Sequence, residues 1–158
     1  MRPGDAASIA RGSAECDEGR ALMRRLDEEL HERYPTASVH GFDPRAIAGG
    51  RGVFVIARVG GEAVGCGAVR PHLPGVGEIK RMYVVPEHRG RGIARAILAA
   101  LEAAAQELSF GTLRLETGPR QAEAIRLYES AGFVAIPPYG EYVGDPFSVC
   151  YEKRLAQP

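Results

Sequence analysis

The residues whose types and spacing most clearly suit ligand chemistry form a short glycine-rich segment in the middle of the chain. The segment consists of Arg89, Gly90, Arg91, Gly92, Ile93 and Ala94. A β-branched apolar stretch precedes it and an alanine-rich helical pattern follows, so we expect it to join a strand to a helix N-terminus. Such a terminus exposes unpaired N–H groups and the positive end of the helix dipole, which bind phosphate. The glycines let a ligand approach the backbone closely, and the arginines can donate paired hydrogen bonds to phosphate oxygens. The segment therefore predicts a phosphate site, with a tight turn and solvated arginines as the alternative.

Two common phosphate-binding motifs are excluded or disfavoured here. Lys80 and Lys153 are the only lysines, and neither completes the G-x-x-x-x-G-K-[ST] pattern of a P-loop. Arg95 stands where a G-x-G-x-x-G fingerprint needs glycine or alanine. The strand before the segment also belongs to an antiparallel meander, which a dinucleotide-binding fold does not open with.

Composition restricts the classes of function. The 158 residues include 20 Lys+Arg and 20 Asp+Glu, and this zero net charge argues against a broad nucleic-acid partner while permitting a local basic patch. Cys16, Cys66 and Cys150 are odd in number and form no C-x-x-C pair, and the four histidines are scattered, so we expect neither a disulfide framework nor a metal site. No apolar run has the length of a signal peptide core or of a membrane span. The expectation is a cytoplasmic protein with no membrane partner.

Hydrophobic periodicity predicts one α+β domain over residues 1–158. Helices are expected at 17–33, at about 90–108, from Pro119 to Gly132, and briefly from Asp43-Pro44 to Gly49. Strands are expected near Ser8–Ala10 and at 53–59, 63–70, 78–85, 113–117, 133–136 and 147–155, with a loop at 71–77. Strands 53–85 form an antiparallel meander, whereas strand 78–85, the long helix and strand 113–117 form a βαβ unit that makes the two strands parallel neighbours. The sheet is therefore mixed.

Two sequence blocks together resemble the GNAT superfamily of acyl-CoA N-acyltransferases. Arg89-x-x-Gly92-x-Ala94 after a strand is similar to the Q/R-x-x-G-x-G/A pyrophosphate loop of that family. The second block comprises Leu113-x-Leu115-Glu116, Gln121-x-x-Ala124-x-x-Leu127-Tyr128 and Ala131-Gly132-Phe133. The resemblance covers roughly residues 50–155, and within the family this stretch is similar to a small bacterial group of acetyltransferases. It implies a single GNAT domain whose parallel strands 78–85 and 113–117 splay apart, and direct acetyl transfer from acetyl-CoA to an amine without a metal.

The resemblance also implies residues that hold acetyl-CoA. The strand stretch Met82, Tyr83 and Val84 would lie along the cosubstrate, because splayed strands leave N–H groups free for a thioester carbonyl at Met82 and a pantetheine amide at Val84. Gln121 stands where many members have asparagine. Tyr128 resembles the family tyrosine beside the CoA sulfur and would protonate the departing thiolate. The alternative is that Tyr128 is a core aromatic residue with a packing role only.

Two glutamates compete for the role of general base. Glu78 lies eleven residues before Arg89, a spacing similar to that of the histone-acetyltransferase base. Glu116 lies twelve residues before Tyr128, a spacing similar to that of ribosomal-protein N-terminal acetyltransferases. We expect both near the opening between the strands, where one could have a raised pKa suited to a base. Each could instead be a structural partner of a neighbouring cation.

The acceptor is predicted only by class. The loops expected around it hold both charge signs and several aromatic rings, which favours a small polar amine. These loop residues are Tyr34, His40, Phe42, Arg45, Tyr139, Glu141, Tyr142 and Asp145, with Arg70 and His72 nearby. A protein or peptide N-terminal or lysine acetyltransferase and a non-catalytic acyl-CoA sensor are the alternatives, and a monomer and a homodimer are equally compatible with the sequence.

Overall fold

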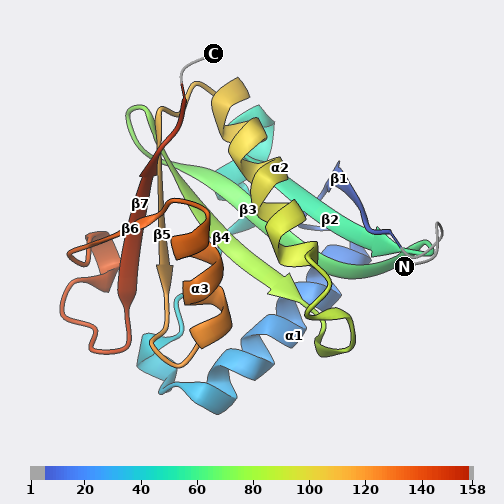
Figure 1. Ribbon diagram of the computed structural model, residues 1–158, viewed down its shortest axis with the longest axis horizontal. Coiled ribbons are helices and arrows are strands. Elements are labelled where there is room, and N and C mark those ends of the chain that lie inside the picture. Colours follow the sequence, from blue (N-terminus) through green and yellow to red (C-terminus); the bar gives the residue numbers. More distant parts are fainter. Residues whose placement is uncertain (1–5, 157–158) are drawn as a thin grey trace.

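A mixed sheet in the strand order β1-β2-β3-β4-β5-β7-β6 forms the centre of the computed structural model, which describes residues 6–156 (Figure 1). The strands are β1 (Ser8–Gly12), β2 (Val53–Val59), β3 (Glu62–Leu73), β4 (Val76–Val84), β5 (Thr112–Thr117), β6 (Val134–Ile136) and β7 (Val149–Arg154). The α-helices are α1 (Asp17–Arg33), α2 (Ile93–Glu107) and α3 (Ala122–Ser130), and short 3-10 helices lie at Thr36–Ser38, Pro44–Gly50, Pro86–His88 and Gly140–Tyr142. The expected α+β fold with a mixed sheet flanked by helices is confirmed.

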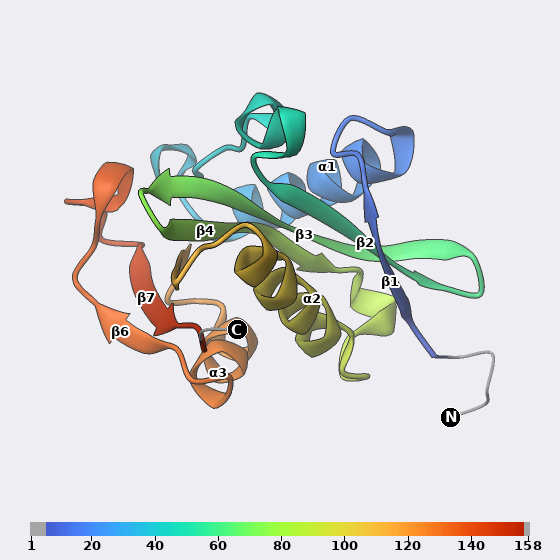
Figure 2. The same cartoon turned by 90° about the horizontal axis from the view of Figure 1, so that it is seen from above.

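The helices cover the two faces of the sheet unequally. Figure 2 shows α1 on one face and α2 and α3 on the other. Leu22 and Leu26 of α1 recur every four positions and are buried against the sheet, while Ile97 and Leu101 of α2 are buried on the opposite face. Apolar residues at this spacing form one stripe of a helix, so both helices are fixed by burying that stripe.

The sheet confirms the expected pairing, including the first strand. β1 pairs antiparallel with β2, and β2–β3–β4 form the meander. Among the described strands only β4 and β5 are parallel, and their register runs from Val76 opposite Thr112 to Ile79 opposite Leu115. Beyond that point β4 continues to Val84 without a β5 partner, while β5 stays paired with β7 as far as Thr117. The predicted splay between the two parallel strands is therefore present.

A bulge in β4 accompanies the splay. Cys66 of β3 lies opposite Tyr83, but Ala68 lies opposite Lys80, so β4 carries one extra residue between these pairs. Arg81 has φ 61°, which is uncommon for a side chain other than glycine. Bulges re-aim side chains at the edges of sites. Here the bulge brings both Lys80 and Arg81 to the cavity described below.

Four expected boundaries were wrong in position. β3 and β4 extend into the predicted loop 71–77 and turn at Pro74–Gly75. Pro71 is tolerated there because β3 has no β2 partner beyond Val69, so its missing N–H removes no hydrogen bond on that side. The helices α2 and α3 begin at Ile93 and Ala122, later than predicted, because each loop before them continues through residues with non-helical backbone.

Candidate active site

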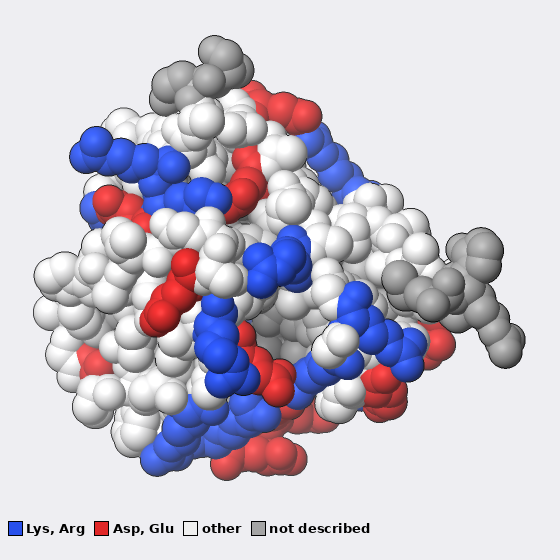
Figure 3. Space-filling view, viewed as in Figure 1, with Lys and Arg blue, Asp and Glu red and all other residues white. Residues whose placement is uncertain are grey.

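A cavity of about 710 Å³ opens where β4 and β5 separate. Its walls come from α1, β4, β5, the start of α2 and α3. Seven basic side chains line it (Arg33, Lys80, Arg81, Arg89, Arg95, Arg120 and Arg126), against three acidic ones (Glu29, Glu116 and Glu123). Figure 3 shows basic side chains around a hollow near the middle of this face. A chain of zero net charge thus concentrates positive charge at one cavity, which suits an anionic ligand.

The glycine-rich segment forms one end of this cavity. Gly90 and Gly92 have φ values of 78° and 80°, a conformation that glycine adopts without strain, and no atom lies within 4 Å of where a Cβ would stand on either. Gly92 is the N-cap of α2, and Ile93 and Ala94 also line the cavity. An open backbone surface before a helix N-terminus fits a pyrophosphate group, so these residues could hold that part of acetyl-CoA.

The two arginines of the segment lie differently from the expectation. Arg89 donates from Nε to the Val84 carbonyl at 2.8 Å and pairs with Glu29 of α1 at 3.0 Å. Its guanidinium therefore ties the β4–α2 loop to α1, which leaves fewer donors for a ligand. Arg91 does not line the cavity and lies 3.4 Å from His88. Arg95 and Arg126, which the sequence reasoning missed, line the cavity from the first turn of α2 and the middle of α3.

Residues 79–84 of β4 line the cavity, and this stretch includes Met82, Tyr83 and Val84. A Cβ on Gly67 would lie 3.0 Å from Met82 Sδ and 2.8 Å from Ile97, so the Met82 side chain packs toward α2. The backbone of Met82 belongs to the stretch that has lost its β5 partner. Backbone groups in this stretch can pair with a ligand in place of a strand.

Gln121 and Tyr128 line the opposite wall of the cavity. Gln121 Oε1 accepts the Gly118 N–H at 3.0 Å, so its side chain shapes the β5–α3 loop. Tyr128 is buried and packs edge-to-face on Phe133. Burial, and secondarily the charge of Glu116, raises the pKa of the Tyr128 phenol well above its ordinary value, so this group stays protonated and can donate.

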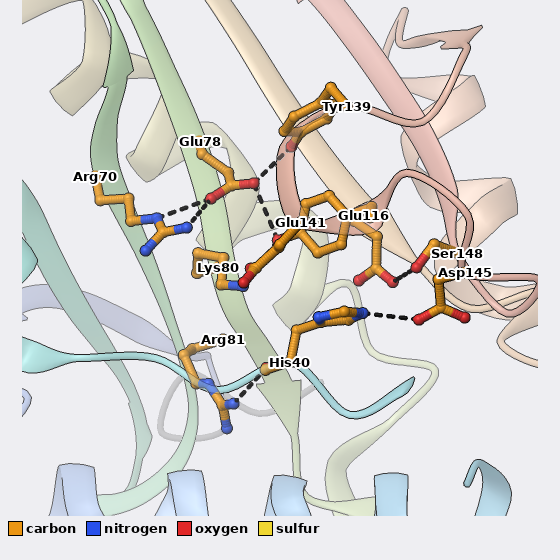
Figure 4. Close-up of polar contacts among 11 residues, drawn as sticks. His40, Arg70, Glu78, Lys80, Arg81, Glu116, Tyr139, Glu141, Asp145 and Ser148 are labelled. Carbon is orange, nitrogen blue, oxygen red and sulfur yellow. Dashed lines mark hydrogen bonds and ion pairs between the residues drawn. The ribbon is translucent and has the colours of Figure 1, made fainter. Parts of the chain in front are cut away.

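Glu78 is held in a structural network (Figure 4). It is 1% exposed, does not line the cavity, and pairs with Arg70 at 2.6 Å. Its other oxygen accepts the hydroxyls of Tyr139 at 2.6 Å and Tyr142 at 3.1 Å. Burial alone raises the pKa of Glu78, but the Tyr139 hydrogen bond and the cations Lys80 and Arg70 outweigh burial and hold that pKa below its ordinary value. This is the environment of an ion-pair partner.

Glu116 has the opposite environment. It lines the cavity, and its one hydrogen bond in the described residues comes from the Ser148 hydroxyl at 2.7 Å. Burial raises the pKa of Glu116, and Ser148, His40 and Lys80 offset this effect only in part. Of the two glutamates, Glu116 is thus the one with cavity access and a raised pKa, as a general base near neutrality requires.

Two loops meet over the far end of the cavity. Asp145 accepts hydrogen bonds from Ser38 at 2.9 Å and His40 at 2.8 Å, and Phe147 packs edge-to-face on Tyr34. These contacts join the segment after α1 to the segment before β7. The residues that line this end are Tyr34, Ser38, His40, Lys80, Arg120 and Phe147. Of the residues expected here, Phe42, Arg45, Arg70, His72, Tyr139, Glu141, Tyr142 and Asp145 do not line the cavity.

Two kinds of feature are absent from residues 6–156. No helix in this range is long and apolar enough to cross a membrane. No group of three or more His, Cys, Asp or Glu side chains in it converges as metal ligands would.

The comparisons with known proteins agree with this geometry. The model of the acetyltransferase (GNAT) family matches residues 19–133. A protein of Azospirillum brasilense named IAA acetyltransferase is 40% identical over 149 residues, which cover 94% of this chain and 97% of the relative. A solved structure from Klebsiella pneumoniae, classed as an acyl-CoA N-acyltransferase, is 36% identical and superposes with a TM-score of 0.80 over 95% of this chain and 98% of that one. A GNAT structure from Elizabethkingia anophelis with acetyl-CoA bound has a TM-score of 0.68 at 18% identity over 98% of this chain and 100% of that one, and thus shares the fold.

Proposed function

The chain belongs to the GNAT acetyltransferase family, and from this premise we propose that it transfers the acetyl group of acetyl-CoA directly to the amine of a small polar acceptor. The observation that carries the proposal is the cavity at the splay, which runs from the glycine-rich segment to Glu116. One end offers backbone for a pyrophosphate, and the other offers a carboxylate suited to proton removal. Acetyl-CoA supplies the activated acetyl thioester.

The cosubstrate would lie along the unpaired stretch of β4. Its backbone contacts in this proposal are Met82, Tyr83, Val84, Gly90, Gly92, Ile93 and Ala94, with Gln121 and Tyr128 at its sides. Arg89 contributes by fixing the loop against Glu29, and its remaining donors face the phosphates. Seven basic against three acidic side chains around the cavity support a polyanionic cosubstrate.

The protein groups have three roles in the transfer. Glu116 accepts the proton of the acceptor ammonium, since an amine must be neutral to attack and its ordinary pKa lies near 10.4. The Met82 N–H stabilises the negative charge that develops on the thioester oxygen. Tyr128 donates its proton to the departing thiolate. Glu78, which the sequence left as a second candidate base, instead orders the acceptor end through Arg70, Tyr139 and Tyr142.

The acceptor end supports a small molecule better than a peptide. Asp145 and the Tyr34–Phe147 contact bridge the two loops that would border a peptide groove. The Azospirillum relative is named for IAA and not for a protein acceptor. Cys16, Cys66 and Cys150 are free, in keeping with a cytoplasmic enzyme.

Calorimetry with acetyl-CoA, followed by thiol release across amines, amino acids, polyamines, aminoglycosides and short peptides, tests the proposal. We expect binding of acetyl-CoA and turnover with one class of small amine. Binding without turnover on any amine would identify a sensor domain, and turnover confined to peptides would identify a peptide acetyltransferase. Absence of acetyl-CoA binding would refute the proposal as a whole.

A further inference from the structure

Lys80 is a buried cation at the acceptor end of the cavity. It is one of only two lysines in the chain, lies in β4 and is 8% exposed. Lysine is almost never this buried unless it is paired. Its side chain lines the cavity just beyond the last β4–β5 pair, Ile79 opposite Leu115. Its partners therefore decide whether it has a structural or a binding role.

The protein leaves part of the Lys80 ammonium without a hydrogen-bond partner. The Glu78 carboxylate is already occupied by Arg70 and by the two tyrosine hydroxyls. In the described residues Lys80 Nζ makes one hydrogen bond, to the Tyr142 hydroxyl at 2.9 Å. Glu141 lies 3.8 Å away, beyond hydrogen-bond distance, on a side chain that is 52% exposed. Because an ammonium carries three donors, donors remain for a ligand.

The neighbouring charges define what such a ligand would be. Arg81, the other buried cation in this stretch, is engaged by Asp27 at 2.6 Å and by the His40 carbonyl at 3.2 Å. Glu116 lines the same end and is near enough to Lys80 for the charge of each to shift the pKa of the other. A carboxylate can be bound at Lys80 while an amine on the same molecule faces Glu116. A second cationic group in that position would be repelled, and a phosphate dianion would add more negative charge beside Glu116 than one lysine offsets.

We propose that the acceptor is an amine that also carries a carboxylate, and that Lys80 Nζ binds this carboxylate while Glu116 faces the amine. The inference rests on the proposed function, since it names the substrate class of the same site. It excludes polyamines and aminoglycosides as good acceptors, and it selects amino acids and related zwitterions.

The test compares acceptors that carry a carboxylate with matched acceptors that lack it. Thiol release is measured at saturating acetyl-CoA for α-, β- and γ-amino acids, each beside its own primary amide. A charged hydrogen bond to a carboxylate predicts kcat/KM about tenfold or more in favour of the acid for at least one spacing. K80M should remove this preference, so that the kcat/KM values for acid and amide become equal within about threefold, and it should leave the Kd for acetyl-CoA within about threefold of the wild-type value. K153M is the matched control, because Lys153 pairs with Glu102 outside the cavity. Its loss should change neither the preference for the acid over the amide nor the Kd for acetyl-CoA.

The outcomes separate this inference from the proposed function. Equal rates for acids and amides, or a preference for amides or diamines, would overturn the inference and leave the acetyltransferase assignment intact. The same holds if acetyl-CoA binds but no amine with a carboxylate turns over. Failure to bind acetyl-CoA would refute the assignment itself. If K80M does not fold, the wild-type comparison of acid and amide decides alone.

Discussion

The two glutamates beside the splay offer a matched test, because replacing each by glutamine should have opposite effects. At Glu78 the change should lower stability and largely spare activity, whereas at Glu116 it should spare stability and lower activity. Glu78→Gln removes the charge that pairs with Arg70, whose side chain is 25% exposed. Breaking a buried pair costs about 3–5 kcal/mol, and the partial exposure of Arg70 reduces this to about 2–3 kcal/mol. For a chain of this length the melting temperature should fall by about 5–10 °C. Activity per folded molecule should change only a few-fold.

Glu116→Gln should leave stability unchanged or improve it. Because burial raises the pKa of Glu116, the folded chain binds this proton more tightly than the unfolded chain, and keeping the group ionised at neutral pH is unfavourable. The variant removes that penalty above the folded pKa, and its advantage disappears as the pH falls below the ordinary value of 4.5. Loss of a general base should lower kcat/KM by about 100-fold or more and abolish the acid limb of the pH profile.

For Glu78 the contribution of the ionised carboxylate to stability has the opposite sign. Its pKa is lowered in the folded chain, so the stability that it contributes is present above 4.5 and is lost as the pH falls through the lower folded value. The assays are thermal unfolding by circular dichroism between pH 4 and 8, and thiol release with the best acceptor over the range in which each variant stays folded. If Glu78→Gln abolished the acid limb while Glu116→Gln retained it, the assignment of the base would be refuted. Equal stability changes in the two variants would refute the electrostatic reasoning.

Three further changes test other parts of the site. Tyr128→Phe should lower kcat by about 100-fold with an unchanged Kd for acetyl-CoA, and an unchanged kcat would return Tyr128 to a packing role. Gly92→Ala, at φ 80°, should lower stability by about 1 kcal/mol and weaken acetyl-CoA binding at least tenfold by calorimetry. Gly60→Ala, at φ 57° in a hairpin turn, is the control that should lose similar stability and keep the wild-type Kd. Gly118→Ala would place a Cβ 2.0 Å from the Tyr34 hydroxyl, so we expect a loss of about 1–3 kcal/mol in chemical denaturation, and wild-type stability would contradict this close contact.

Most elements of the fold could be predicted from local pattern. Apolar residues every four positions predicted α1, and the β-branched runs around Gly60–Gly61 predicted the hairpin of β2 and β3. The predicted boundaries were wrong where tertiary pairing sets the end of an element. Pro71 marks a loop by its own chemistry, yet it lies in β3 because that side of the strand has no partner there.

The candidate site also has a part that local sequence predicts and a part that it does not. The glycine-rich loop could be recognised from sequence because positive φ and close backbone approach are demands on residues next to one another in the chain. The roles of Glu78 and Glu116 could not be separated, because both begin or end a strand beside a predicted opening. Their difference lies in partners remote in sequence, Tyr139 and Tyr142 for one and Ser148 for the other.

By itself, the sequence predicted the order of the elements and a glycine-rich loop before a helix N-terminus, since both depend on short motifs and local periodicity, and its resemblance to the GNAT family implied acetyl-CoA as the donor. The tertiary structure alone decided that Arg89 is tied to Glu29 and that Lys80 is buried beside the cavity with a single hydrogen bond among the described residues. Burial and electrostatic coupling depend on which side chains the fold brings within a few ångströms, and the spacing of residues along the chain does not specify those distances.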